Sequence, residues 1–393
     1  MDFNSFSIYR PKMEYRRFGK TNKRVSVITL GGMRYRNAHL DPRDEVGPDT
    51  LAQCRDTVEK ALKQGINLIE TAYGYGKSEH AYGIVLNDQL KIKRSSYFLM
   101  TKGSPKTAQE TRSLVESQLK ALKTDYLDFY AWHGINTLEL YETACATGGP
   151  VEELLKMKKE GIIGHIGFST HAPLDVIIKA IDTDLFDFVN LHYYYFFQRN
   201  LPAVDLAYAK DMGVFIISAN DKGGQLFRPS QKLKELTAPL HPLQWNARFC
   251  LSHPGIHTLS FGLPVTVQFE DLNGIFPAPS PLSEQDAQIK QLLDDQKLLD
   301  PYSGFDPYCM ENDPSGLNIP EILRFRMMWK CYDMLDFGVY RYNMFQEKGH
   351  WFPGSFPTEE NLAMVDTSRI PADVPVIELI RQTHKGLYRP KKS

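Results

Sequence analysis

The chain has 393 residues, of which 42% are hydrophobic and 24% are charged, and its formal net charge is −1. These proportions are ordinary for a soluble globular protein, and the balanced charge excludes the basic stripe of a nucleic-acid-binding surface. No run of about 18 apolar residues is present, so we expect no transmembrane helix and no membrane partner.

The N-terminus and the cysteines indicate a compartment. The N-terminal segment lacks the apolar stretch of a secretory signal, and we expect residues 1–13 to form a loose leader. The five cysteines are odd in number and lie far apart in the sequence. This usage argues against a disulfide scaffold and for a reducing cytosol, so we expect a cytoplasmic protein.

Strand and helix patterns alternate along the first half of the chain. Residues 14–27 are predicted to form a hairpin that closes the bottom of a barrel. Further strands are predicted over 25–30, 67–69, 97–101 and 126–132, and helices over 50–64, 78–89, 108–122 and 151–160.

The second half repeats this alternation. Strands are predicted over 165–169, 186–191, 214–218 and 256–261, and helices over 174–181, 201–212, 242–252 and 267–273. Alternation of this kind predicts a parallel sheet, and eight such units predict an α/β fold, the (β/α)8 TIM barrel of about 250 residues. No Gly-x-Gly-x-x-Gly motif opens the first unit, which argues against a Rossmann fold.

The composition changes near residue 277. Residues 277–281 are rich in proline and are predicted as a linker, and residues 282–299 are predicted as a helix. We therefore predict a barrel domain over 14–276 and a mainly helical or irregular C-terminal extension over 277–393.

Four polar side chains stand at the ends of three consecutive predicted strands: Glu70, Tyr75, Lys102 and His133. In a parallel barrel these ends share one rim, where catalytic groups gather. A nearby lysine ammonium favours a phenolate and lowers the pKa of the tyrosine, and a carboxylate can hold the lysine in place. Each residue alone also fits a structural or surface role. Together they suit polarisation of a carbonyl and proton delivery while a cofactor supplies hydride.

These residues and their neighbours resemble the aldo-keto reductase family over about residues 14–275. The family motif Asp-Thr-Ala-x-x-Tyr-Gly is present as the segment from Glu70 to Gly76, and the family's lysine and histidine match Lys102 and His133. The resemblance implies that Tyr75 is the general acid, that Lys102 modulates its pKa and that His133 orients the substrate. Glu70 replaces the family's Asp and moves the carboxylate by about an ångström. Either Lys102 shifts to meet it, or activity is low.

The resemblance also implies a nicotinamide cofactor. Ser169 matches the serine of the family's Gly-x-Ser-Asn motif, whereas Thr170 replaces its asparagine. Asn190 stands where relatives carry an amide side chain. Ser218 and Lys222 lie in the segment that corresponds to the family's pyrophosphate loop, where Asp221 adds an unexpected charge.

The adenosine end of the cofactor site matches the family in part. Gly262 and Gln268 keep the family spacing, and Asn273 lies one place late. The basic residues that relatives use for a 2′-phosphate are missing from residues 263–269. NADP(H) is therefore implied by the family, with NAD(H) as the alternative.

The C-terminal extension carries a resemblance of its own. The segment from Cys309 to Pro320 is similar to the C-terminal part of aldo-keto reductases with a ferredoxin-like iron–sulfur cluster. Such a cluster ordinarily needs four thiolates, and here Cys309 stands alone locally with Cys331 further on, so we expect a degenerate module without a cluster. His253 and His257 have the spacing of a metal pair, but Pro and Gly between them break any helix, and we expect no metal site.

Three functions fit the sequence. The first is NAD(P)H-dependent reduction of small aldehydes or ketones, and the second is a catalytically weak cofactor-sensing or interaction protein. The second is motivated by Glu70, Thr170 and Ser218, which depart from the family. The third is an iron–sulfur electron-transfer oxidoreductase. The aromatic residues 193–197 could equally line a pocket or pack beneath the extension. The sequence indicates neither the substrate nor an oligomeric state.

Overall fold

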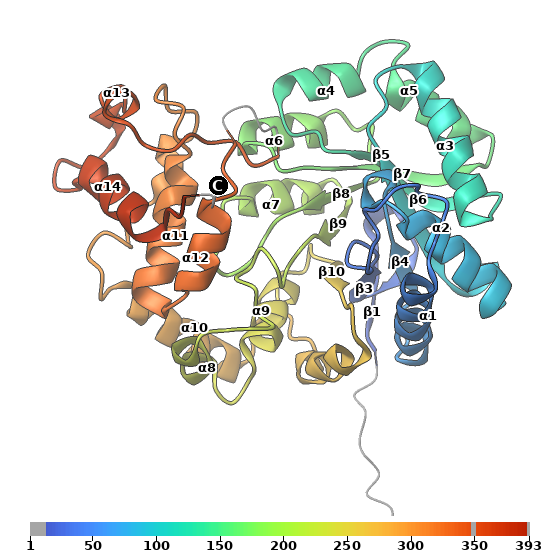
Figure 1. The fold of residues 1–393 in the computed structure, drawn as a ribbon, viewed down its shortest axis with the longest axis horizontal. Coiled ribbons are helices and arrows are strands. Elements are labelled where there is room, and N and C mark those ends of the chain that lie inside the picture. The colour runs from blue at the N-terminus through green and yellow to red at the C-terminus, as the bar shows by residue number, and fades with distance from the viewer. Residues whose placement is uncertain (1–12, 347–350, 391–393) are drawn as a thin grey trace, which may run out of the picture.

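The computed structural model describes residues 13–346 and 351–390. Its central feature is a closed barrel of parallel strands in the order β10-β3-β4-β5-β6-β7-β8-β9 (Figure 1). The barrel strands are β3 (Ile28–Gly31), β4 (Leu68–Glu70), β5 (Phe98–Gly103), β6 (Leu127–His133), β7 (Ile163–Ser169), β8 (Phe188–Leu191), β9 (Gly213–Ile216) and β10 (Thr258–Gly262). This closure confirms the predicted (β/α)8 barrel.

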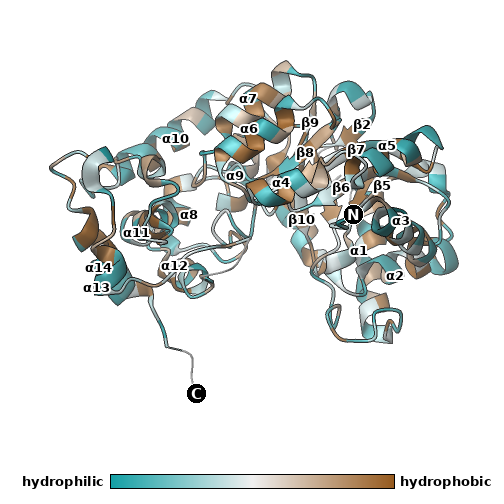
Figure 2. Ribbon diagram, turned by 90° about the horizontal axis from the view of Figure 1, so that it is seen from above, coloured by the Kyte–Doolittle hydropathy of each residue, from teal (hydrophilic) through white to brown (hydrophobic). Residues whose placement is uncertain are grey.

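Helices cover the outside of the barrel and connect its strands. The helix predicted over 108–122 is present as α3 (Ala108–Leu122), whose first turn is fixed by Thr107 because its hydroxyl accepts the Glu110 amide at 3.1 Å. The other helices of this layer are α1 (Pro48–Lys63), α2 (Ser78–Gly83), α4 (Leu138–Ala144), α5 (Pro150–Lys159), α6 (Leu174–Asp182), α7 (Leu201–Ala209), α8 (Gln231–Thr237) and α9 (Pro242–Leu251). The strands are coloured mostly as hydrophobic, whereas the helices alternate, as expected for elements with one face on a core (Figure 2).

Three predicted elements differ from the structure. The strand predicted over 25–30 is split, because β2 (Arg24–Ser26) pairs with β1 (Tyr15–Arg17) outside the barrel. The second half of the helix predicted over 78–89 is a π-helix, η3 (Ile84–Gln89). The last predicted helix is a 3-10 helix, η5 (Thr266–Ile275).

The antiparallel hairpin β1–β2 closes the bottom of the barrel, as predicted. Its turn carries Phe18, which is fully buried. The Phe18 ring meets Phe129 edge to face with centroids 5.4 Å apart and lies 5.6 Å from Phe188. Burying such a side chain contributes about 1.5–3 kcal/mol. An apolar plug therefore fills this end, and the polar strand ends face the other.

The chain after the barrel folds into a helical extension that lies beside it in Figure 1. Its α-helices are α10 (Glu284–Lys297), α11 (Ile319–Tyr332), α12 (Leu335–Tyr342), α13 (Glu359–Leu362) and α14 (Val376–Leu387). Asp286 of α10 forms a buried ion pair with Arg248 of α9 at 2.6 Å. The division of the chain near residue 277 into two domains stays a prediction.

The aromatic run 193–197 packs mainly beneath the extension. The Tyr195 hydroxyl donates to Asp294 of α10 at 2.7 Å, and the Phe196 ring lies 4.9 Å from that of Tyr332. The leader expected over residues 1–13 lies outside the described residues except for Met13. None of the helices in the described ranges has the length and apolarity that crossing a bilayer requires.

Candidate active site

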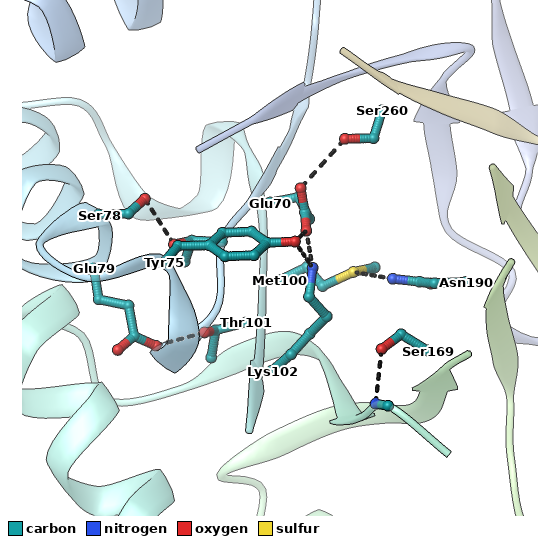
Figure 3. Close-up of polar contacts among 12 residues, drawn as sticks. Glu70, Tyr75, Ser78, Glu79, Met100, Thr101, Lys102, Ser169, Asn190 and Ser260 are labelled. Atoms are coloured by element: carbon teal, nitrogen blue, oxygen red, sulfur yellow. Dashed lines mark hydrogen bonds and ion pairs between the residues drawn. The ribbon is translucent and has the colours of Figure 1, made fainter. Parts of the chain in front are cut away.

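Three of the four predicted catalytic side chains meet at one end of the barrel (Figure 3). Glu70 ends β4, Tyr75 ends the 3-10 helix η2 (Tyr73–Tyr75), and Lys102 lies near the end of β5. Lys102 Nζ donates to the Tyr75 hydroxyl at 3.1 Å and forms an ion pair with Glu70 Oε1. The Tyr75 hydroxyl donates to Glu70 Oε1 at 3.3 Å. The Lys102 and Glu70 side chains are 1% and 3% exposed, so the pair is shielded from water.

His133, the fourth predicted residue, ends β6 and faces Tyr75. The two rings are perpendicular, with centroids 5.9 Å apart. Tyr75, Lys102 and His133 line a cavity of about 400 Å³, a size that holds a small organic molecule. Glu70 lies behind them and lines an adjoining groove.

Burial dominates the electrostatics of this group. Burial raises the pKa of the Tyr75 phenol, and Arg34 opposes that shift to a smaller extent. Burial also lowers the pKa of the Lys102 ammonium, while the neighbouring Glu70 carboxylate works against the change. Burial thus raises the Tyr75 pKa overall, and the expectation that Lys102 modulates this pKa stays a prediction.

The longer carboxylate of Glu70 is accommodated by its surroundings. Ser260 donates to Glu70 Oε2 at 3.3 Å. A Cβ atom on Gly31 would lie 3.3 Å from the same oxygen and 2.8 Å from Ser260 Oγ. The glycine thus leaves room for the extra methylene. We expected either that Lys102 meets the longer side chain of Glu70 or that activity is low. In the structure Lys102 is in contact with Glu70.

A groove of about 170 Å³ adjoins the cavity and contains three of the predicted cofactor residues. Ser218, Gly262 and Gln268 line it. Ser218, whose φ of 56° is left-handed, also borders the cavity. Lys222 and Ser169 line the cavity as well.

Three buried amide oxygens have no hydrogen-bond partner within the described part of the chain: Asn190 Oδ1, Asn220 Oδ1 and Gln268 Oε1. Asn220 and Gln268 line the groove, and Asn190 follows at the end of β8, where its amide donates to Met100 Sδ at 3.5 Å (Figure 3). Leaving a buried acceptor unpaired costs about 1–3 kcal/mol. A ligand that carries N–H or O–H donors would remove this cost.

Two further predicted cofactor residues, Thr170 and Asn273, lie outside the lining of the groove and the cavity, as Asn190 does. The Thr170 hydroxyl donates to the Ile135 carbonyl at 2.6 Å and accepts the Ala172 amide at 3.0 Å, so it serves the loop after β7. Asn273 donates to Glu270 at 3.0 Å within η5. Neither side chain lines the groove or the cavity, and this placement does not support cofactor contact by either residue.

The sequence interpretation missed several residues that line the cavity. Arg34 follows β3 and pairs with Asp221 at 2.5 Å, which neutralises the charge that stood out in the sequence. Arg34 could have been found, because it follows a strand end like the catalytic residues. Arg341 and Trp351 reach the cavity from the extension, where no motif marks them.

His253 and His257, at which we expected no metal site, make contacts within the fold. His253 Nε2 lies 2.9 Å from Asp205 Oδ1, and His257 Nδ1 accepts the Val214 amide at 2.9 Å. The described residues contain no group of three or more side chains placed to hold a metal. Cys309 and Cys331 are free thiols, and Cys331 donates to Ser303 at 3.3 Å.

Comparison with known proteins identifies relatives of the barrel. A sequence profile of the Aldo/keto reductase family matches residues 27–243. The aldo-keto reductase YhdN of Bacillus subtilis (strain 168) is 31% identical over 219 residues, which cover 51% of this chain and 59% of that protein. D-arabinose 1-dehydrogenase of Saccharomyces cerevisiae is 29% identical over 161 residues, which cover 39% of this chain and 45% of that protein. The chain thus spans about half the length of the curated relatives it matches.

Solved structures share the fold. The aldo-keto reductase AKR11C1 from Bacillus halodurans in its holo form has a TM-score of 0.58 at 21% identity, covering 71% of this chain and 96% of its own. PA4992 from Pseudomonas aeruginosa, described as a proposed aldo-keto reductase, has a TM-score of 0.54 at 22% identity, and the match covers 74% of this chain and 100% of that one. At such identities the likeness establishes the barrel architecture alone.

Proposed function

The chain belongs to the aldo/keto reductase family, and from this we propose that it reduces aldehyde or ketone carbonyls with hydride from NAD(P)H and a proton from Tyr75. The observation that carries the proposal is the contact of Lys102 with both Tyr75, at 3.1 Å, and Glu70. These groups border a cavity large enough for a small carbonyl compound.

Each side chain has a defined task in this reaction. The bound cofactor supplies hydride to the carbonyl carbon. Tyr75 donates its proton to the carbonyl oxygen, and the Lys102 ammonium stabilises the phenolate that remains. Glu70 fixes the position of Lys102. His133, across from Tyr75, orients the carbonyl by donating a hydrogen bond to its oxygen.

The groove provides groups that fit a dinucleotide. The unpaired oxygens of Asn220 and Gln268 line the groove and are acceptors for amide and hydroxyl donors, which nicotinamide and ribose carry. Asn190 Oδ1 is a further unpaired acceptor near the end of β8. Ser218 lines both the groove and the cavity, and Ser169 lines the cavity, so each adds a hydroxyl group near the cofactor. We propose NADP(H) as the cofactor from the family, with NAD(H) as the alternative because residues 263–269 carry no basic side chain.

Turnover tests the proposal directly. A panel of small aldehydes and dicarbonyls is incubated with NADPH or NADH, and cofactor oxidation is followed by absorbance. We expect turnover by the native protein and a loss of at least about 10²-fold in kcat for Tyr75→Phe, which removes the proton donor. Demonstrated cofactor binding with no oxidation of either cofactor by any substrate would defeat the proposal.

A second candidate is a cofactor-sensing protein with weak catalysis. Two observations favour it: burial raises the pKa of Tyr75, and the Thr170 hydroxyl is occupied by the Ile135 carbonyl. Calorimetric titration with both cofactors and the Glu70→Asp variant separate the candidates. Tight binding with negligible turnover, restored by Glu70→Asp, favours the sensor, whereas a lower kcat in that variant favours the reductase.

We further propose that the extension is a degenerate relative of the iron–sulfur modules of other family members. Cys309 lies in the 3-10 helix η6 (Pro307–Met310), and Cys331 lies in the separate helix α11. One thiol therefore remains in the segment that resembles those modules, where a cluster would need several. Iron analysis after anaerobic preparation tests this, and stoichiometric iron with a brown colour would overturn it. We also propose a cytoplasmic location, from the cysteine usage.

A further inference from the structure

A second chamber adjoins the catalytic cavity between the barrel and the extension. The chamber has a volume of about 240 Å³. Residues that follow β7, β8 and β9 line it on the barrel side, and residues 308–324, Arg341 of α12 and residues 351–354 line it on the side of the extension. Four residues line both spaces: His171, Lys222, Arg341 and Trp351. A ligand that reaches Tyr75 can therefore extend toward these four side chains.

Basic groups are concentrated at this junction. Lys222 Nζ lies 3.3 Å from His171 Nδ1 and 3.4 Å from His192 Nε2. His192 Nε2 itself lies 2.6 Å from His171 Nδ1. Lys222 also lies over the Trp351 ring at 5.7 Å. Within the described ranges Lys222 has no ion pair with a carboxylate, so its charge is compensated only at a distance.

Arg341 adds a buried guanidinium that forms no ion pair with the residues that the structure describes. It is 4% exposed, and its Nε atom has no hydrogen-bond partner among residues 13–346 and 351–390. Its contacts are the Phe352 ring at 4.0 Å and Met344 Sδ at 3.6 Å. A buried, unpaired cation of this kind is costly, and an anion that pairs with it would offset the cost.

The carboxylates around the junction are engaged with other groups. Asp221 pairs with Arg34 at 2.5 Å, and Glu321 pairs with Arg324 at 2.7 Å. Glu311 pairs with Arg199. Asp313 accepts the backbone amides of Ser315 and Asp366 at 3.0 Å. The arginines with acidic partners are thus neutralised. Among the described residues that line both spaces, Lys222 and Arg341 are the cationic side chains without an ion pair, and they can pair with a ligand.

We propose that Lys222 and Arg341, with the histidines beside them, bind an acidic group on the far side of the carbonyl substrate, a carboxylate or a phosphate. This inference rests on the proposed reductase function and names the substrate class of the same site. The substrate is then a small aldehyde or ketone acid. One end of it lies at Tyr75 and His133, and the other is held between the barrel and α12.

The ionisation of the cluster supports this assignment. Burial lowers the pKa of Lys222, and Arg341 and Arg34 add to this, whereas Asp221 and Glu321 oppose it. Burial likewise lowers the pKa of His192, and the nearby Lys222, His171 and Arg341 lower it further. An anion at the junction would reverse these shifts, so its binding should take up protons.

Matched pairs of aldehydes test the substrate class. Succinic semialdehyde is compared with butyraldehyde, and glyceraldehyde phosphate with glyceraldehyde, so that the two pairs distinguish a carboxylate from a phosphate. We expect a higher kcat/KM for the acidic member of at least one pair. Arg341→Gln should lower that preference about tenfold, mainly through KM, and Arg341→Lys should retain part of it.

The matched control is Arg326→Gln. Arg326 is also a buried arginine of the extension, but it pairs with Asp300 at 2.5 Å and does not line the cavity, so the preference should persist. Equal use of charged and neutral aldehydes, or a preference that survives both Arg341 variants, overturns the inference while leaving the reductase proposal intact. Absence of turnover with every aldehyde instead defeats the proposed function.

Calorimetry provides a measurement that does not depend on turnover. Inorganic phosphate and succinate are titrated into the full chain with saturating NADPH present, near pH 8, in buffers of different ionisation enthalpy. We expect binding of at least one anion with net proton uptake, weakened about tenfold in Arg341→Gln. Absence of binding, binding without proton uptake, or displacement of the cofactor by the anion would overturn the assignment.

Discussion

Lys102 and Tyr75 form the contact on which the proposed chemistry depends, and burial sets the ionisation of both. The ammonium lies 3.1 Å from the phenol oxygen, where its charge stabilises a phenolate. Burial lowers the pKa of Lys102 and raises that of Tyr75. The phenol therefore keeps its proton until a substrate accepts it, and the charge on Lys102 favours that transfer because it stabilises the phenolate that forms.

This arrangement predicts a rate that falls as pH rises. Lys102 is charged below its pKa, and because burial lowers that pKa, the ammonium is lost at a lower pH than the value of about 10.4 for an exposed lysine. We expect kcat/KM for a neutral aldehyde to decline through this lowered pKa. A profile that stays flat to about pH 10 would contradict the assignment of Lys102.

Removing the charge should have a large effect on catalysis. We expect Lys102→Met to lower kcat by about 10²-fold or more, because the phenolate loses its cationic neighbour. Lys106→Met is the matched control, since Lys106 is exposed in the segment after β5 and should leave kcat unchanged. Similar rates for the two variants would show that Lys102 has a structural role.

The sequence located these residues because each stands at a strand end, and parallel strand ends share one rim. Ser260 and Arg34 obey the same rule and could have been included. Arg341 and Trp351 could not, because they reach the cavity through packing of the extension, which no local pattern encodes. The direction in which the Tyr75 pKa shifts could not be predicted from the sequence either, because it depends on how much water the folded chain excludes from the phenol.

Among the elements, α3 and η3 show what local patterns can and cannot specify. Thr107 marks the start of α3 in the sequence through its capping hydroxyl. In η3, the Asn87 amide donates to the Gly83 carbonyl at 2.9 Å and to Leu122 at 3.2 Å. The second bond is a tertiary contact that accompanies the departure from α-helical winding, and periodicity alone does not reveal it.

The junction of α9 and α10 predicts a stability effect. Arg248 holds the buried Asp286 through two bonds of 2.6 and 2.8 Å. We expect Arg248→Met to destabilise the protein by about 3–5 kcal/mol in denaturant unfolding, because it strands a buried carboxylate. Arg17→Met removes an exposed pair with Asp211 and should have no measurable effect. Equal stability of the two variants would contradict this account.

The same pair has a defined pH dependence. Burial raises the pKa of Asp286, but hydrogen bonds from Arg248 and Ser283 outweigh it, and the net pKa is lowered. The stabilisation is therefore present above the unfolded value of about 3.9 and is lost as pH falls through the lowered one. We therefore expect the difference in the free energy of unfolding between the native protein and Arg248→Met, measured by denaturant unfolding, to become smaller at acidic pH.

At the scale of the whole molecule, barrel and extension share a large apolar cluster, while the barrel interior around Phe18 and Phe129 forms a smaller cluster of its own. A single cluster of buried side chains runs from Met13 to Leu387, and the aromatic run 193–197 connects its two parts. We expect one cooperative thermal transition with equal calorimetric and van't Hoff enthalpies. Two separate transitions would show that the extension unfolds independently, in line with the predicted division at residue 277.

Gly31 and Glu70 are distant in the chain, but the size of the side chain at one position limits the side chain at the other. A methyl group at position 31 would press on Ser260 Oγ and on the carboxylate of Glu70, whereas the shorter aspartate would withdraw from it. Among homologues, glutamate at position 70 should therefore co-occur with glycine at position 31, while larger residues at position 31 should accompany aspartate. The evolutionary exchange of one acid for the other would then require a permissive first step at position 31.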